Sequence, residues 1–232
     1  MLGVLVNTAT VIIGSAIGLI FKKGISKKIS DAVMIAIGAC TLLIGINGCL
    51  GSTNALITII SMVLGTIVGT LVDIDKQINR AGDYLKNKFT KTGSTFTEGF
   101  VTGCLIFCVG AMTITGSIES GISGNYSTIF AKSLLDLISS MMLTCALGIG
   151  VMFSSVFVFV FQGALVLLAQ YIGPFLGEAV IGEITSVGSV IIILLGFNII
   201  GIGKFKVANF LPAIFISPFV YYVYCFIAQL LQ

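Results

Sequence analysis

The chain has 232 residues, of which 57% are apolar and only 9% are charged, and its mean hydropathy is +1.15. Soluble globular domains are about 45–50% apolar and about 25% charged, so this composition excludes a water-soluble protein and indicates a chain folded in a lipid bilayer. The net charge of +3, with no basic cluster beside aromatic residues, argues against nucleic-acid binding.

Apolar runs follow one another along the whole chain, each close to the about 20 residues that a helix needs to cross a bilayer. They predict an all-α polytopic membrane protein whose residues 1–232 form a single transmembrane domain. About eight transmembrane helices are expected, at residues 2–21, 29–50, 54–72, 99–118, 128–149, 152–172, 178–200 and 207–228.

The fifth and sixth of these spans have no charged loop between them. One continuous helix over residues 128–172 would be about 67 Å long, whereas the hydrocarbon core is about 30 Å thick. The chain must therefore turn back near residues 148–155.

Lysine and arginine predict the orientation, because they accumulate in cytoplasmic loops. With the first loop inside, eleven of the twelve basic residues are cytoplasmic and only Lys132 departs. This assignment places both termini outside.

Residues 73–98 are the one polar stretch, and Ile74, Leu85 and Phe89 belong to an apolar series at helical spacing within it. This periodicity fits an amphipathic helix on the cytoplasmic membrane surface. It fits equally well a solvated linker helix between residues 1–72 and 99–232.

The first three spans start outside and the next three start inside, which is the arrangement of an inverted repeat. A Gly-Ser pair also precedes an aspartate in both units, at Asp31 and at Asp136. The sequence thus suggests a 3+3 inverted repeat followed by two further helices.

Ionisable residues in the spans are costly in hydrocarbon, at about 2.5–3.5 kcal/mol or more each. The candidates are Glu119, Lys132, Asp136 and Glu183. One interpretation is a cation or proton site that opens to the exterior, with Asp136 and Glu183 as ligands and Lys132 tuning their charge. The alternative is that Lys132 and Asp136, spaced i, i+4, form a neutralised structural pair, while the glutamates reach the headgroups.

Residues 110–121 alternate hydroxyl and apolar side chains between glycines, with Thr113, Thr115 and Ser117 among them. β-branched threonine and flexible glycine both weaken a helix. We therefore expect a broken or irregular end to the fourth span, lining a path. A close helix crossing that uses small residues is the alternative.

Polar residues further along extend the predicted ion or solute pathway inward. Gln162 lies in the sixth span, and Asn198 and Asn209 bracket the last cytoplasmic loop. Pro212 and Pro218 are expected to kink the eighth span.

The chain has no histidine, which removes the commonest metal ligand and the usual general base. Cys104 and Cys108 share a helix face, but no third or fourth ligand stands near them in sequence. No metal, no cofactor and no enzymatic activity are expected.

Several runs resemble one bacterial membrane family, catalogued as domain of unknown function 554. They are GVLVNTATVIIGSAIGL, LGTIVGTLVDID, GAMTITGSIESGISGNYSTIFAKSLLDLISSMML, LGIGVMFSSVFVFVFQGALVLLA and LGFNIIGIGKFKVANFLPAIF. The resemblance implies a multi-pass protein of the bacterial cytoplasmic (inner) membrane, loosely described as a transporter. It implies no substrate, mechanism or site residue.

The leading functional hypothesis is a secondary transporter or permease for a small ion or solute, with the lipid bilayer and copies of itself as further partners. The alternative is a non-transporting membrane scaffold that docks another protein through residues 73–98. A lipid-modifying enzyme is a weaker third hypothesis, because the sequence shows no nucleophile–base constellation.

Overall fold

The computed structural model describes residues 1–22, 27–50, 54–77, 80, 95–108 and 111–230, and the regular elements among them are all helical. The predicted all-α class is confirmed. The α-helices are α1 (Leu2–Lys22), α2 (Lys27–Cys49), α3 (Ala55–Val72), α5 (Phe96–Cys108), α6 (Ala111–Ile122), α7 (Ser127–Leu147), α8 (Gly150–Ile172), α9 (Glu178–Ile200) and α10 (Pro212–Leu230). The 3-10 helices η1 (Gly173–Phe175) and η2 (Val207–Phe210) precede α9 and α10.

Six helices in the described part of the chain are long and apolar enough to cross a bilayer: α1, α3, α7, α8, α9, and α10 taken together with η2. Helices α5 and α6 qualify jointly as a seventh span, bent by 58° between them. Within α2, Ile35–Cys49 form a shorter apolar helix. Long apolar side chains cover the outside of the molecule, as expected for a protein whose solvent is lipid.

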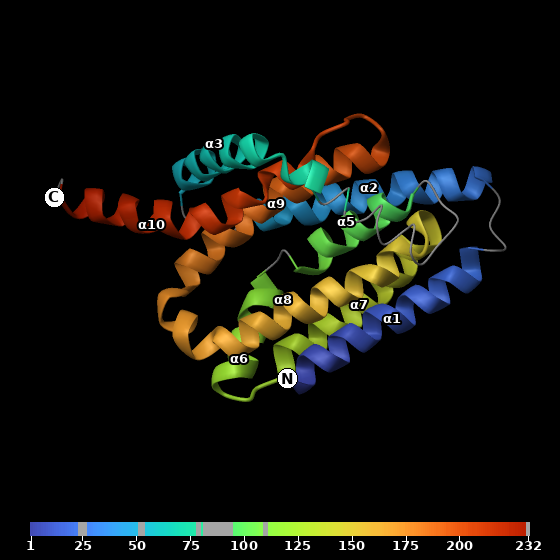
Figure 1. The fold of residues 1–232 in the computed structure, drawn as a ribbon, viewed down its shortest axis with the longest axis horizontal. Helices are drawn as coiled ribbons and strands as arrows, with labels where there is room; N and C mark the ends of the chain where they lie inside the picture. Colours follow the sequence, from blue (N-terminus) through green and yellow to red (C-terminus); the bar gives the residue numbers. More distant parts are fainter. Residues whose placement is uncertain (23–26, 51–53, 78–79, 81–94, 109–110, 231–232) are drawn as a thin grey trace.

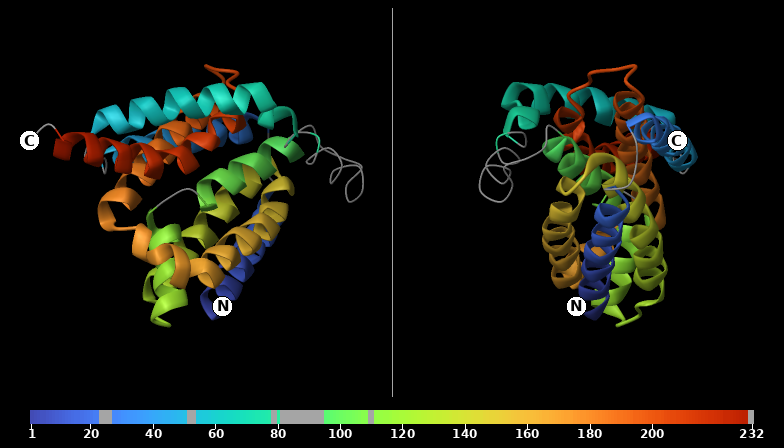
Figure 2. Two further views of the ribbon diagram at one scale, coloured as in Figure 1. Left: turned by 60° about the vertical axis from the view of Figure 1, so that its left-hand side comes forward. Right: turned by 90° about the vertical axis from the view of Figure 1, so that its right-hand side faces the viewer.

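The helices form two groups that meet around α5 and α9 (Figure 1). Helices α1, α6, α7 and α8 make the lower group, and α2, α3, α9 and α10 make the upper one; Figure 2 shows the same division from two further sides. Helix α9 is the most central span, with 61% of its apolar window buried, whereas α10 has 11% buried and lies at the periphery.

Helices α1 and α7 are the most closely packed pair in the lower group. A Cβ at Gly14 would lie 2.3 Å from the carbonyl oxygen of Leu137, and one at Gly18 would lie 2.4 Å from that of Met141. Glycine is therefore required at both positions, as in other close membrane helix crossings. Both contacts advance in the same direction along the two helices, so α1 and α7 run parallel.

The other main pairs also have defined directions. Helix α5 runs parallel to α8, because Gly99 meets Val151 and Gly103 meets Ser154. Helix α3 runs antiparallel to α10, with Gly65 against Ala213 and Gly69 against Asn209, and α2 runs antiparallel to α9. All these directions agree with a chain that reverses at every predicted span.

The fourth span is interrupted, but not where the sequence suggested. The predicted broken fourth span is confirmed by the bend between α5 and α6, but residues 111–122, which include Thr113, Thr115 and Ser117, form the regular helix α6, so irregular backbone at the end of the span is wrong. The bend lies before this helix, between α5 and α6. The hydroxyl of Thr113 donates to the carbonyl oxygen of Phe107 at 3.0 Å. The threonine thus satisfies a carbonyl at the bend and stabilises the break from inside the next helix.

The two prolines near the end of the chain act differently from the expected pair of kinks. Pro212 is the first residue of α10, a position where a missing N–H costs nothing. Pro218 lies inside α10, and the Ser217 hydroxyl donates to the Ile214 carbonyl oxygen at 3.0 Å. That carbonyl is the one whose i→i−4 partner Pro218 removes, so the helix continues.

The predicted amphipathic segment 73–98 lies mostly outside the described residues, which resume at Thr95.

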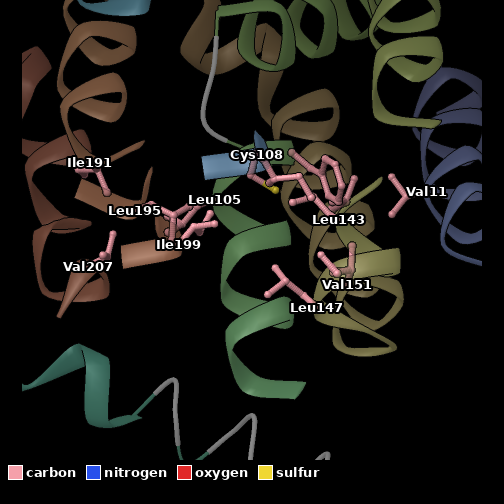
Figure 3. Close-up of a cluster of buried hydrophobic side chains, with 14 residues drawn as sticks. Val11, Leu105, Cys108, Leu143, Leu147, Val151, Ile191, Leu195, Ile199 and Val207 are labelled. Atoms are coloured by element: carbon pink, nitrogen blue, oxygen red, sulfur yellow. The ribbon is translucent and has the colours of Figure 1, made fainter. Parts of the chain in front are cut away.

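The main apolar core lies where the two groups meet (Figure 3). Cys108, Leu143 and Val11 mark its side toward α1 and α7, and Leu195 and Ile199 mark its side toward α9.

Candidate functional site: a polar layer inside the helix bundle

Lys132 and Asp136 form an ion pair on α7, as their i, i+4 spacing predicted. Lys132 is 6% exposed and Asp136 5% exposed, so neither side chain reaches lipid headgroups or bulk water. A buried charge is tolerated only when it is paired and hydrogen-bonded. In this structure Lys132, not a free cation, neutralises the Asp136 carboxylate, which is the arrangement that the structural alternative described.

Two hydrogen-bonded amides on neighbouring helices lie near this pair. The Asn7 amide on α1 donates to the Gln162 carbonyl oxygen on α8 at 3.1 Å. Along the α1–α7 contact, Gly3 lies against Ile129 and Gly14 against Leu137, so Asn7 lies at about the level of the ion pair on α7. Both amides are fully buried, and Asn7 Oδ1 and Gln162 Nε2 have no partner within the described residues. One buried acceptor and one buried donor therefore remain available, at a usual cost of about 1–3 kcal/mol each.

Helix α6 adds hydroxyl groups to the same level of the bundle. A Cβ at Gly121 would lie 2.4 Å from the Val166 carbonyl oxygen, so α6 and α8 touch at these positions. Ser117 precedes Gly121 by four residues and Gln162 precedes Val166 by four, so each lies one helical turn before that contact. The Ser117 hydroxyl is fully buried and has no partner among the described residues.

Apolar side chains close this polar layer on its predicted outer side. Val4, Ile129 and Val166 form one buried cluster, with Tyr126 packed against it. Val4 is three residues before Asn7 on α1, and Val166 is four residues after Gln162 on α8. Each is one helical turn from its amide, so the cluster covers the polar layer on its outer side.

The main core closes the layer on its predicted cytoplasmic side. Val11 follows Asn7 by one turn on α1, and Val158 precedes Gln162 by one turn on α8. Both belong to the cluster that contains Cys108 and Leu143, labelled in Figure 3. Cys108 lies close enough to interact electrostatically with Lys132 and Asp136. The structure thus holds a polar layer between two apolar ones.

Glu183 lies elsewhere and serves a different purpose. Its side chain is fully buried, and its Oε1 accepts the backbone N–H of Asn54 at 3.3 Å. Asn54 is the N-cap residue of α3, and a carboxylate there complements the positive end of the helix dipole. Among the described residues no hydrogen bond or ion pair joins Glu183 on α9 to Asp136 on α7, and their shared role as cation ligands stays a prediction.

The remaining predicted pathway residues hold loops in place. Glu119 Oε2 accepts the Thr128 hydroxyl at 2.8 Å, linking the end of α6 to the start of α7. Asn198 makes two 2.8 Å hydrogen bonds to the backbone of Phe205. Asn209 accepts the backbone N–H of Asp75 at 2.8 Å. Thr115 is half-buried on α6.

Comparison with known proteins agrees with this membrane architecture. The family described as "Protein of unknown function (DUF554)" matches residues 2–222. The chain belongs to this family. A DUF554 relative in Bacillus subtilis (strain 168), "Uncharacterized membrane protein YdfK", is 35% identical over 96% of each chain. "Uncharacterized protein YqgA" of Escherichia coli (strain K12) is 26% identical over 94% of each chain. No solved structure matches the chain.

This DUF554 protein also has a cavity with charged lining, which we call the vestibule, beside the first turns of α5. The sequence did not predict it. The cavity measures about 480 Å³ and lies between the start of α5, the end of α9 and the loop at 201–206. Its polar lining comes from Asp75, Thr97, Glu98, Thr102, Asn198, Lys204 and Lys206. These residues come from distant parts of the sequence, so no local spacing reveals the cavity. The only sequence signal is that Glu98 and Lys204 each stand at the inner end of a predicted span.

Proposed function

We propose that this membrane protein is a secondary transporter for a small ion or solute in the bacterial cytoplasmic membrane, and that the structure represents its closed state. The polar layer between two apolar layers carries the proposal. A transporter must bind its cargo near the middle of the bilayer and must never be open to both sides at once. The Asn7–Gln162 amides and the Lys132–Asp136 pair supply buried polar groups inside the spans, and apolar layers lie on both sides of them.

The available hydrogen-bonding groups support the same proposal. A protein that only needs a stable interior gains little from leaving polar atoms unpaired, because each one costs free energy. Asn7 Oδ1, Gln162 Nε2 and the Ser117 hydroxyl come from three helices and are buried without partners in the described part of the chain. Polar groups retained at such a cost in a membrane interior are expected to serve function.

The proposal includes eight spans, with α5 and α6 as one broken span and both termini outside. Contacts between the ends of helices support this topology, because each contact joins two segments that the topology places on the same side. At the predicted cytoplasmic side, Lys22 donates to the Ala146 carbonyl oxygen at 3.4 Å, and Lys206 contacts Asp73. At the predicted outer side, Tyr222 donates to the Phe175 carbonyl oxygen at 2.7 Å.

The 3+3 inverted repeat stays a prediction. In the described residues α1 packs mainly on α7, and α2 packs mainly on α9. A 3+3 operation would instead relate the α1–α7 contact to one between α2 and the fourth span, so the observed pairs give it no support.

A non-transporting scaffold is the second candidate, because a sealed Lys132–Asp136 pair is also what a purely structural core would contain. Such a role predicts that the pair can be replaced by apolar side chains without loss of function. We therefore use this replacement to separate the two proposals.

The test uses purified protein in three sets of liposomes, loaded with a dye selective for H⁺, Na⁺ or K⁺ and each placed under a gradient of the ion that its dye reports. Wild-type protein is expected to carry a flux in at least one gradient. Asp136→Asn and the apolar double variant Lys132→Met with Asp136→Leu are expected to abolish it. Glu119→Gln is the matched control, since its carbonyl oxygen still accepts from Thr128. Absence of flux from wild type under all three gradients, or full flux in the apolar double variant, would overturn the proposal.

A further inference from the structure

The vestibule at the inner end contains a cation and an anion that do not neutralise each other. Lys204 comes from the loop after α9, and Glu98 comes from the first turn of α5. In the described part of the chain, the ion pairs are Lys132–Asp136 and Lys206–Asp73. Lys204 and Glu98 thus face the same cavity without a salt bridge between them.

The walls around these two charges are fixed by other residues. Two hydrogen bonds from Asn198 hold Phe205, and Lys206 contacts Asp73 at 3.3 Å. Asn209 binds the backbone of Asp75 from the other side. Lys206 is thereby paired, and within the described residues Lys204 and Glu98 are a cation and an anion of the lining without an ion pair.

A third group lies at the floor of the vestibule. Thr102 lines the cavity from α5 and is fully buried. Its hydroxyl has no hydrogen-bond partner within the described residues. Beyond it lie Leu195, Ile199 and Val207, which line the cavity and also belong to the main apolar core. The vestibule therefore ends at the apolar layer that separates it from the polar layer.

We infer that this vestibule binds a small zwitterion, a molecule with one ammonium and one carboxylate group, from the cytoplasmic side. Glu98 receives the ammonium, Lys204 receives the carboxylate, and the Thr102 hydroxyl hydrogen-bonds the ligand at the floor. The four charged lining residues sum to zero, two cationic and two anionic, so the cavity favours a ligand without net charge. A cavity of about 480 Å³ falls in the range of small-molecule sites. The inference rests on the proposed function in making this zwitterion the transported cargo and in placing the vestibule on the cytoplasmic side.

The test is equilibrium dialysis of the detergent-purified full chain with radiolabelled L-alanine as the zwitterionic probe. Propionate and ethylamine, which each carry one of the two charges, serve as competitors. Wild-type protein is expected to bind alanine at least about tenfold more tightly than either competitor, since each charge-assisted hydrogen bond contributes about 1.5–3 kcal/mol. Equal binding of alanine and one competitor would overturn the inference, as would the absence of alanine binding.

The variants assign the binding to this cavity. Glu98→Gln and Lys204→Gln are each expected to weaken alanine binding about tenfold or more. Thr102→Val is expected to weaken it about fivefold, and Thr102→Ser, which keeps the hydroxyl, is expected to bind as wild type. Glu178→Gln and Lys28→Gln are matched controls outside the cavity. Unchanged binding in Glu98→Gln, Lys204→Gln and Thr102→Val would show that alanine binds elsewhere.

The two proposals fail independently. Asp136→Asn is expected to keep alanine binding, because the apolar core separates Asp136 from the vestibule. Alanine binding without any flux contradicts the transporter and leaves the vestibule site in place. Flux without alanine binding contradicts the zwitterion site and leaves the transporter in place.

Discussion

Asp136 and Glu183 are both buried carboxylates in membrane helices, but different groups stabilise them. Asp136 is paired with Lys132 one turn away on the same helix. Glu183 on α9 accepts a backbone N–H from Asn54 at the start of α3. The first carboxylate is neutralised by a side chain and the second is bound by a helix end, so burial of an acid in a membrane does not by itself indicate an ion site.

The two arrangements also differ in what surrounds them. The Lys132–Asp136 pair lies in the lower group with the amides of Asn7 and Gln162, each of which has one atom without a partner among the described residues, whereas Glu183 joins two helices of the upper group. Loss of either partner on α7 should therefore disturb the interior of the lower group. Loss of Glu183 should instead loosen the start of α3.

The largest expected effect comes from Lys132→Met. This substitution leaves the Asp136 carboxylate buried without its cation, and breaking such a pair costs about 3–5 kcal/mol. We expect a large drop in the unfolding midpoint, measured by titration of the purified protein with a denaturing detergent.

The double variant Lys132→Met with Asp136→Leu is the control for this prediction. Replacing both members of a buried pair by apolar residues is often neutral or stabilising, so it should recover most of the lost stability. A double variant as unstable as Lys132→Met would show that the pair is not the source of the effect.

Asn7→Leu is expected to have the next largest effect. It leaves Gln162 without its amide partner in the fully buried layer, at a cost of about 1–3 kcal/mol. Adding Gln162→Leu should restore stability, because both polar partners are then removed. The same detergent titration measures both variants. If Asn7→Leu is as stable as wild type, the hydrogen bond between the two amides contributes nothing.

Glu183→Leu tests the second carboxylate, which binds the start of α3. Removing this acceptor from the start of α3 should cost about 1–2 kcal/mol, as loss of a helix cap usually does. Glu183→Gln keeps a carbonyl oxygen for the Asn54 N–H and should lose much less. Hydrogen exchange of the first turn of α3 is the most direct measurement. Equal protection in all three proteins would contradict a capping role.

The sequence could predict the features that depend on local spacing. The span positions follow from hydrophobic runs, and the Lys132–Asp136 pair follows from i, i+4 geometry on one helix. The amide of Gln162 could be placed in a span, but its bond to Asn7 depends on how α1 and α8 pack. Such contacts join residues far apart in the chain, and no periodicity encodes them.

The position of the helix break shows the same limit. Glycines and threonines at 110–121 indicated weak helix propensity near the true bend, but propensity alone does not decide which turn gives way. Thr113 satisfies the Phe107 carbonyl oxygen, so the threonine helps to stabilise a break that precedes it. The hydrogen bond that Glu183 accepts from Asn54 could not be predicted either, because the start of α3 is distant from Glu183 in sequence.

The smallest expected effect concerns the exposed pair of Asp73 and Lys206 at the vestibule rim. Burial raises the pKa of Asp73. The hydrogen bond and positive charge of Lys206, with the backbone hydrogen bond and charge of Lys76, lower it by more, so the pKa of Asp73 is below its ordinary value. A carboxylate with a lowered folded-state pKa contributes stability above its unfolded pKa of about 3.9 and loses that contribution as the pH falls through the folded value. The difference in unfolding midpoint between wild type and Lys206→Gln should therefore be small and constant above about pH 5, and should vanish as the pH falls below about 4. Unlike Lys132, Lys206 can be removed without leaving a charge in hydrocarbon, because water solvates the Asp73 carboxylate. A midpoint difference that grows on acidification would contradict this assignment of the pair.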